Sequence, residues 1–359
     1  MNPAVPAPPD QALVARTVQS KLPFRVDLSK IMPLTGDASN RRYFRLELAG
    51  GPPHSIVLMQ LASPEAFKQS EEAVSKHAAP VIELPFVNIL NHLAKADVPV
   101  PTLHYYDTAA GLLYLEDLGD LTLAAATQEA TSPDTALLYR QAIDVLIRIH
   151  LKASFPVDPQ CLAFGRAFDV PLLMWEFDHF IEYGIEKRAG MVLPDEDRRR
   201  IRSEMQKIAE QLATQQTVFT HRDYHSRNLM VQDERIRVID FQDALMGPAT
   251  YDLASLLRDS YLSLDQELSD ELIVRYLEGM AKAGAPLNPM QFMRLFDLTS
   301  IQRNLKAAGR FVYILLEKNN DRFMPYVPRT LANVKRNLEK YQGLHTLRAA
   351  LARHVPELS

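Results

Sequence analysis

The fold of this chain is decided by one stretch, which reads His221-Arg222-Asp223-Tyr224-His225-Ser226-Arg227-Asn228 and is followed by Val238-Ile239-Asp240-Phe241. Two short apolar runs, residues 228–231 and 236–239, are separated by the polar residues 232–235. Over residues 217–245 this pattern predicts a loop, a strand, a tight turn and a second strand. In such a hairpin Asn228 begins one strand and Asp240 follows its antiparallel partner, so their side chains can meet at one end of the ribbon.

These residue types suit the transfer of a phosphoryl group. That reaction needs a divalent metal that neutralises the phosphate oxygens, and Mg²⁺ prefers carboxylate and amide oxygens that are held rigidly. We therefore predict Asn228 and Asp240 as ligands of Mg²⁺. Asp223 precedes them on the loop, where it can face an acceptor hydroxyl and accept or orient its proton.

The composition is that of an ordinary globular protein. The 359 residues include 40 Lys and Arg against 44 Asp and Glu, and this net charge of −4 offers no basic surface for nucleic acid or an anionic membrane. The only cysteine, Cys161, excludes a disulfide within the chain and favours a reducing compartment. With no apolar run of membrane-spanning length and no secretion signal, we expect a cytoplasmic protein. The glycines form neither the dinucleotide fingerprint nor the Walker phosphate loop.

The pattern of the chain changes near residue 117. A hairpin is predicted at residues 43–59. Its first strand alternates in polarity at residues 43–48, its turn is Gly-Gly-Pro-Pro at residues 50–53, and its second strand is the apolar run at residues 55–59. A helix is predicted at residues 86–96, followed by extended segments at 101–106 and 111–115. From residue 132 onward long amphipathic helices dominate. The prediction is an α+β fold with a small antiparallel-sheet lobe at residues 1–117 and a mostly helical lobe at residues 118–359.

At this point the sequence resembles the protein-kinase-like superfamily, and most closely its aminoglycoside-phosphotransferase branch. The resemblance covers residues 35–316 and rests on the 221–228 loop, on Ile239-Asp240-Phe241-Gln242-Asp243, on Tyr251-Asp252-Leu253-Ala254 and on the strand and hinge at residues 112–118. Within the branch, residues 35–45 and 302–306 resemble the anomeric kinases of N-acetylmuramate and N-acetylglucosamine that recycle cell-wall sugars. The resemblance implies a two-lobed kinase-like fold, ATP and Mg²⁺ as cofactors and an amino-sugar acceptor.

The resemblance also implies a role for each matched residue. Asp223 is the expected catalytic base or orienter, with Asn228 and Asp240 as the metal ligands. The turn at residues 36–42 is expected to cover the phosphates, and the hinge backbone to pair with adenine. The residues expected to bind the nucleotide are Gly36, Ser39, Arg41, Arg42, Glu116 and Leu118, and those expected to bind the acceptor are Arg303 and Asn304.

One departure from the family pattern concerns the phosphates. The family has a Lys near the end of the strand after the phosphate-covering turn, whereas residues 57–60 here read Val-Leu-Met-Gln. We hypothesise that Arg41 or Arg42 supplies the missing positive charge through a forked guanidinium contact.

Other interpretations remain open. One alternative is another small-molecule kinase, with an acceptor of the aminoglycoside, choline or homoserine type. A second alternative, consistent with the missing Lys, is a scaffold that binds nucleotide without catalysis. A non-haem iron site with His221 and Asp223 is disfavoured by the helical surroundings. For single residues we predict that the His221 ring bonds loop backbone, that Asp252 caps a helix or braces the loop, and that Trp175, Phe177 and Phe180 belong to the core.

Overall fold

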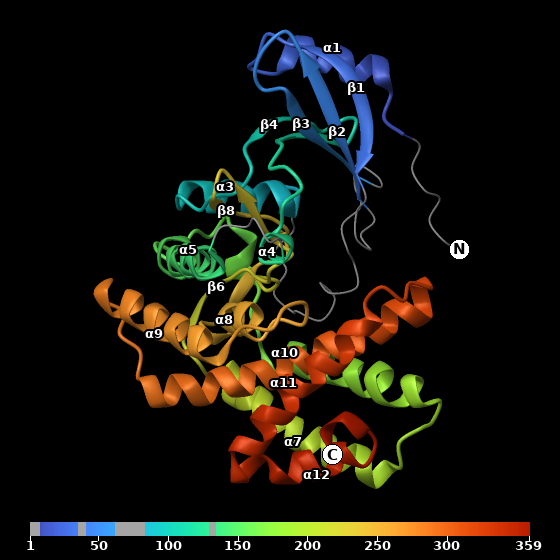
Figure 1. Ribbon diagram of the computed structural model, residues 1–359, viewed down its shortest axis with the longest axis vertical. Helices are drawn as coiled ribbons and strands as arrows, with labels where there is room; N and C mark the ends of the chain where they lie inside the picture. The colour runs from blue at the N-terminus through green and yellow to red at the C-terminus, as the bar shows by residue number, and fades with distance from the viewer. Residues whose placement is uncertain (1–7, 35–40, 62–82, 129–133) are drawn as a thin grey trace. The chain divides into compact units, whose positions relative to one another are not determined.

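Within the described residues, five antiparallel strands form one sheet with the strand order β1-β2-β3-β5-β4 (Figure 1). The computed structural model describes residues 8–34, 41–61, 83–128 and 134–359. The sheet belongs to the first of two compact units, Met1–Gln69 with Val100–Asp120. The elements of this unit are α1 (Gln11–Lys21), β1 (Asp27–Leu34), β2 (Arg42–Ala49), β3 (Ser55–Gln60), β4 (Leu103–Asp107) and β5 (Leu112–Glu116).

The register of β2 and β3 confirms the predicted hairpin. Phe44 pairs with Leu58 and Leu46 pairs with Ile56. Because alternate residues of a strand share a face, these four side chains lie on one side of the sheet, where they are buried in one apolar cluster with residues of α1. Strand β1 was not predicted, because its sequence, Asp-Leu-Ser-Lys-Ile-Met-Pro-Leu, does not alternate between apolar and polar residues, and none of its side chains is fully buried.

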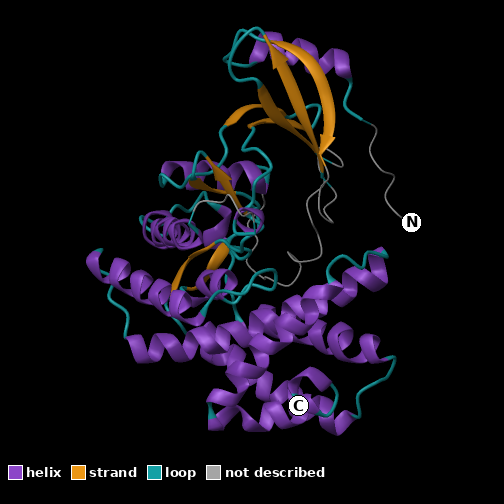
Figure 2. Ribbon diagram, in the orientation of Figure 1, coloured by secondary structure: helices purple, strands orange, loops and turns teal. Residues whose placement is uncertain are grey.

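Helices dominate the second unit, Ser70–Pro99 with Leu121–Ser359 (Figure 2). The predicted α+β class, a small antiparallel sheet and a mostly helical remainder, is confirmed. Among the helices that the structure describes, none is long and apolar enough to cross a membrane. The elements of this unit are α3 (Pro85–Lys95), α4 (Leu123–Ala126), α5 (Thr135–Arg148), η1 (Ile149–Ala153), η2 (Leu162–Gly165), α6 (Val170–His179), η3 (Phe180–Lys187), α7 (Asp195–Ala213), β6 (Thr217–Thr220), β7 (Leu229–Gln232), β8 (Arg235–Val238), β9 (Leu245–Pro248), α8 (Thr250–Leu257), α9 (Gln266–Lys282), α10 (Pro289–Lys318), η4 (Met324–Tyr326), α11 (Val327–Lys340), η5 (Gln342–Leu344), α12 (His345–Ala352) and η6 (Pro356–Leu358).

Two details of the second unit differ from the sequence-based expectation. The segment before residue 221, predicted as loop, forms strand β6, which pairs antiparallel with β9. Strands β7 and β8 are equally short but are joined by a tight turn, whereas the partner of β6 lies far along the chain, so no local turn reveals the pairing. The described residues 83–99 also group with this unit, because α3 packs against η1 and η2, whereas a single boundary after residue 117 is predicted. The helix that accompanies the sheet in the first unit is therefore α1, not α3.

Helix α10 carries much of the apolar core of the second unit. It packs against α6, η3, α8 and α11. Phe177 and Phe180 are fully buried in this core and Trp175 packs against it, as predicted. Cys161 is also buried, and burial raises the pKa of its thiol to about 11, which agrees with an unreactive cysteine.

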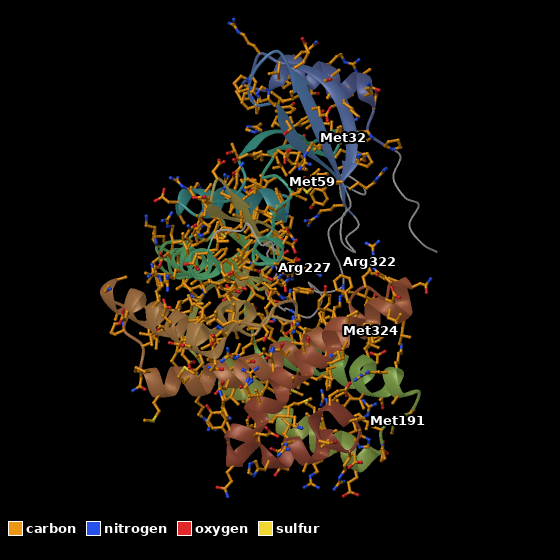
Figure 3. All side chains as sticks on the ribbon, viewed as in Figure 1. Met32, Met59, Met191, Arg227, Arg322 and Met324 are labelled. Atoms are coloured by element: carbon orange, nitrogen blue, oxygen red, sulfur yellow. The ribbon has the colours of Figure 1, made fainter. Side chains whose placement is uncertain are left out.

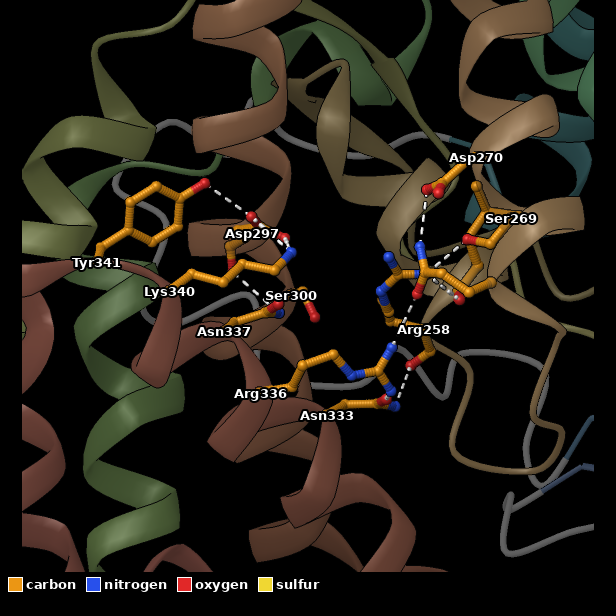
Figure 4. Close-up of polar contacts among 12 residues, drawn as sticks. Arg258, Ser269, Asp270, Asp297, Ser300, Asn333, Arg336, Asn337, Lys340 and Tyr341 are labelled. Carbon is orange, nitrogen blue, oxygen red and sulfur yellow. Dashed lines mark hydrogen bonds and ion pairs between the residues drawn. The ribbon is translucent and has the colours of Figure 1, made fainter.

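A buried carboxylate adds polar contacts between α10 and the end of α11 (Figure 4). Asp297 of α10 accepts hydrogen bonds from Lys340 Nζ at 2.9 and 3.0 Å and from the Tyr341 hydroxyl at 2.7 Å. Because Asp297 is almost fully buried, these charge-assisted bonds are stronger than those of a surface ion pair. They hold in place the helix that carries the predicted acceptor residues.

The close approach of α10 to η3 predicts a stability effect at Gly309. A Cβ added there would lie 2.8 Å from the Cα of Phe180 and 3.2 Å from the carbonyl oxygen of His179, both of them backbone atoms. We expect Gly309→Ala to lower the free energy of unfolding by about 2 kcal/mol, because overpacking outweighs the helix propensity gained. Urea unfolding measures the change. Gly343→Ala, where a Cβ meets nothing within 4 Å, is the matched control, and equal losses in both variants would contradict the packing argument.

Candidate active site

Strand β6 leads into the loop at residues 221–228, and one buried carboxylate at the start of α8 holds the first turn of this loop. Asp252 Oδ2 accepts from the backbone N–H of His221 at 2.7 Å, and Oδ1 accepts from that of Arg222 at 2.9 Å. Arg222 has φ of 79°, a left-handed conformation that costs free energy for a non-glycine residue. The two bonds stabilise this conformation, so the predicted loop-bracing role of Asp252 is confirmed.

The His221 ring joins the loop to the hairpin. Its Nδ1 accepts from the backbone N–H of Asp223 at 3.3 Å, which leaves the proton on Nε2. Nε2 then donates to the carbonyl oxygen of Ile239 at 2.9 Å. The predicted structural role of His221, a ring that bonds loop backbone, is confirmed.

The hairpin brings the three predicted catalytic and metal residues together. Leu229 pairs with Val238, which places Asn228 and Asp240 at the same end of the β7–β8 ribbon. Asn228 Nδ2 donates to the backbone carbonyl of Asp223 at 2.9 Å and lies 3.3 Å from Asp240 Oδ2. Gln242 Nε2 donates to the other Asp240 oxygen at 2.8 Å. The Asn228 side chain therefore connects the loop that carries Asp223 to the residue that follows β8.

The donor set at this corner fits Mg²⁺. Because Asn228 Nδ2 donates to a carbonyl, its Oδ1 is the amide atom left to serve as a ligand. The carboxylate of Asp240 is exposed. Among the described residues no group of three or more His, Cys, Asp and Glu side chains gathers as a cage. One carboxylate and one amide oxygen, completed by phosphate oxygens and water, is a typical arrangement for Mg²⁺.

Cations surround Asp223 and keep its carboxylate ionised. Burial opposes ionisation, but Lys306 foremost, with Arg222 and Arg303, holds the pKa of Asp223 well below the usual value. A carboxylate of low pKa is a weak proton acceptor in the ground state. The electrostatics therefore favour the orienting role over that of a strong base.

A buried carboxylate behind the loop was not anticipated from the sequence. Glu176 of α6 is fully buried, and its Oε1 lies 3.0 Å from both Arg222 Nη2 and Lys306 Nζ. Its Oε2 accepts from Gln302 Nε2 at 2.7 Å. Burial opposes ionisation of Glu176, yet Lys306 and Arg222 lower its pKa. The only sequence signal was a single charge within the apolar run at residues 172–177.

The last part of the loop is held by aromatic rings. The guanidinium of Arg227 (labelled in Figure 3) lies 3.9 Å from the ring centre of Tyr261 and 4.9 Å from that of Tyr326. It also donates to the Tyr326 hydroxyl at 2.6 Å. His225 packs edge-on against Tyr261. These contacts pack both side chains between the loop and its aromatic neighbours.

The predicted nucleotide-binding residues belong to the first unit, and part of this set can be placed. Gly36 and Ser39 lie outside the described residues. Arg41 precedes β2, and the guanidinium of Arg42, in β2, lies 4.9 Å from the ring centre of Phe44. Glu116 ends β5, where its carboxylate accepts from the N–H and the hydroxyl of Thr102 at 3.0 Å each; Leu118 follows and is buried.

A fork of hydrogen bonds connects the segment that contains Leu118 to strand β2 of the same unit. Arg45 Nε donates to Asp117 at 2.6 Å, and Arg45 Nη1 donates to Asp120 at 2.9 Å. These two carboxylates, Asp120 first, raise the pKa of Arg45. The backbone of the predicted hinge is thus held by the sheet that carries it.

The two predicted acceptor residues differ in their surroundings. Asn304 donates to the Ser300 carbonyl at 2.8 Å, one turn earlier in α10. Positions i and i+2 of an α-helix point about 200° apart around the helix axis. Asn304 therefore lies on roughly the opposite side of α10 from Lys306. Arg303 is 6% exposed, and its Nε and Nη1 are buried without a hydrogen-bond partner among the described residues.

The chain is similar in sequence to known phosphotransferases. Residues 30–286 match the profile of the family described as "Phosphotransferase enzyme family". The chain is 32% identical over 322 residues to an N-acetylmuramate/N-acetylglucosamine kinase of Neisseria meningitidis serogroup B, covering 89% of each chain. It is also 32% identical to the protein of that name from Pseudomonas putida, covering 86% of this chain and 84% of the relative.

Solved structures show the same fold at low identity. A choline/ethanolamine kinase family protein from Mesorhizobium loti superimposes with a TM-score of 0.57 at 16% identity, covering 94% of this chain and 98% of the other. A putative aminoglycoside phosphotransferase from Ralstonia eutropha gives a TM-score of 0.59 at 13% identity, covering 95% and 98%. At these identities the likeness concerns the fold alone.

Proposed function

The chain belongs to the phosphotransferase enzyme family, and we propose that it is an ATP-dependent kinase that phosphorylates the anomeric hydroxyl of N-acetylmuramate and N-acetylglucosamine. The observation that carries this proposal is the match at 32% identity to kinases of these sugars over most of both chains. The convergence of Asp223, Asn228 and Asp240 at one corner supports phosphoryl transfer as the chemistry. Because the co-substrate is ATP, we infer action in the cytoplasm, in the recycling of cell-wall sugars.

Each residue has a defined task in the proposed reaction. Asp223 accepts a hydrogen bond from the sugar hydroxyl and directs its oxygen in line with the γ-phosphate. As the new O–P bond forms, the bond between the γ-phosphorus and ADP breaks, ADP leaves, and the hydroxyl proton passes to Asp223 or to water. Asn228 and Asp240 hold Mg²⁺, which supplies charge neutralisation on the phosphate oxygens when bound. Lys306 and Arg222 keep Asp223 ionised, so the carboxylate accepts a hydrogen bond and does not donate one.

The nucleotide-binding residues of the first unit stay part of the proposal. The turn at residues 36–42, with Ser39, is expected to cover the phosphates through backbone N–H groups. Arg41 or Arg42 is expected to replace the absent Lys, and backbone atoms near Glu116 and Leu118 are expected to pair with adenine.

Steady-state kinetics of Arg41→Ala and Arg42→Ala test this replacement. A raised KM for ATP in either variant supports it, and unchanged KM and kcat in both variants would contradict it.

A product assay tests the proposed function. The protein is incubated with ATP and MgCl₂ and, in turn, with N-acetylmuramate, N-acetylglucosamine, an aminoglycoside, choline and homoserine. The expected result is a phosphorylated product from the two amino sugars, with the phosphate located on the anomeric oxygen by phosphorus and proton NMR. Product from only one of the other acceptors would assign a different kinase, and ATP binding without any product would favour the scaffold.

A further inference from the structure

Arg303 is a buried cation that forms no ion pair with any residue the structure describes. Its side chain lies on α10, with two guanidinium nitrogens shielded from solvent and no hydrogen bond or ion pair to any described residue. A buried charge without a partner destabilises a protein by several kcal/mol, and natural proteins retain one mainly where function requires it. This is the pattern expected of a group whose partner is a bound anion.

The charges around Arg303 do not satisfy it. Arg222 and Lys306 share the carboxylate of Glu176, so this anion is already neutralised by two cations. Asp223 responds to the charge of Arg303 through space, yet the two side chains form no ion pair. Arg303 therefore lies close enough to influence the charge of Asp223 but forms no ion pair with it.

The proposed acceptors supply a specific anion. N-acetylmuramate carries a carboxylate on the lactyl ether at C3, whereas N-acetylglucosamine has a neutral hydroxyl there. A hydroxyl at C1 that meets Asp223 places the lactyl carboxylate on another side of the pyranose ring, apart from Asp223. The guanidinium of Arg303 lies near Asp223 without contacting it, which suits the separation between the C1 hydroxyl and the lactyl carboxylate of one sugar. The planar guanidinium can also donate two hydrogen bonds to a carboxylate.

We propose that Arg303 is a specificity-determining residue that binds the carboxylate of the acidic acceptor sugar. This inference rests on the proposed function, which it deepens. Arg303 then distinguishes the acidic sugar from the neutral one and has no direct part in the transfer of the phosphoryl group.

Steady-state kinetics with the two sugars test the proposal. In Arg303→Met we expect the KM for N-acetylmuramate to rise about 10- to 100-fold, the range of one charge-assisted hydrogen bond or a pair of them. The kcat/KM for N-acetylglucosamine is expected to fall far less, so that the ratio of kcat/KM for the two sugars shifts by about tenfold or more. Arg303→Lys retains the charge but loses the fork, and is expected to fall between the wild type and Arg303→Met. Arg310→Met, an exposed arginine two turns further along α10, is the matched control.

A stability measurement separates this role from a structural one. Replacing an uncompensated buried cation with Met is expected to leave the Tm of the free protein unchanged or raised, whereas a structural role requires a lower Tm. Equal losses of kcat with both sugars would assign Arg303 to the phosphoryl group and overturn the proposal. Unchanged kinetics with both sugars would overturn it as well.

A failure of the proposed function can be distinguished from a failure of the inference about Arg303. If the wild type phosphorylates neither sugar, the proposed function fails, and calorimetric titration of both sugars in the presence of ADP still tests Arg303. Binding of N-acetylmuramate that is lost in Arg303→Met supports the carboxylate contact. Absence of binding to the wild type overturns it.

Discussion

Asp223→Asn is expected to lower kcat for the sugar substrates by about 10²- to 10⁴-fold while the affinity for ATP is retained. The substitution keeps the size of the side chain but removes the charge that directs the acceptor oxygen. The amide also presents an N–H donor where the hydroxyl needs an acceptor. Single-turnover rates, measured beside ADP binding by calorimetry, separate this effect from a loss of nucleotide binding.

The matched control is Asp233→Asn in the turn between β7 and β8. Asp233 is exposed and has φ of 49°, a conformation that Asn adopts readily. This variant is expected to retain the activity of the wild type. Wild-type turnover in Asp223→Asn would remove the assigned role of Asp223.

Glu176→Gln is expected to cause a large loss of stability. The substitution leaves Arg222 and Lys306 without the carboxylate that they share, and breaking a buried ion pair in this way costs about 3–5 kcal/mol. Urea unfolding at pH 7 measures the loss. Activity is also expected to fall, because Glu176 holds Arg222 and Lys306, and these two cations keep the neighbouring Asp223 ionised.

The pH dependence gives a second test of Glu176. Its pKa is lowered in the folded protein, because Lys306 and Arg222 outweigh burial, so the stability it contributes is fully present above the ordinary carboxyl pKa of about 4.3. This contribution is lost as the pH falls through the folded-state pKa. The difference between wild type and Glu176→Gln is therefore expected to be constant near pH 7 and to shrink below about pH 4.

Glu182→Gln is the control for this measurement. Glu182 lies on η3, and its carboxylate is 51% exposed beside Lys187. An exposed ion pair contributes little, so the unfolding midpoint is expected to stay nearly unchanged. A loss in Glu182→Gln as large as that in Glu176→Gln would contradict the argument from burial.

The sequence predicted those parts of the fold whose contacts join residues that are close to one another along the chain. The β2–β3 and β7–β8 hairpins and helix α3 each carry their own periodic pattern and turn. The elements that were missed lack such a pattern: β1 is largely exposed at the sheet edge, and β6 is short and pairs with a distant partner.

The same distinction applies to the site. Asp223, Asn228 and Asp240 lie within one loop and hairpin, so their spacing alone predicts that they meet. The resemblance predicts Arg303 as an acceptor residue, but only the structure shows that its buried Nε and Nη1 bond no described residue. Asn304 was predicted with it, although its amide bonds its own helix.

By itself, the sequence determined the α+β class and the corner where Asn228 approaches Asp240, because hairpin register depends on neighbouring residues. Only the tertiary structure decided that Glu176, Arg222 and Lys306 form one buried network beside Asp223. The physical reason is distance along the chain. The three residues come from α6, the loop and α10, and no local period relates segments that only packing brings together.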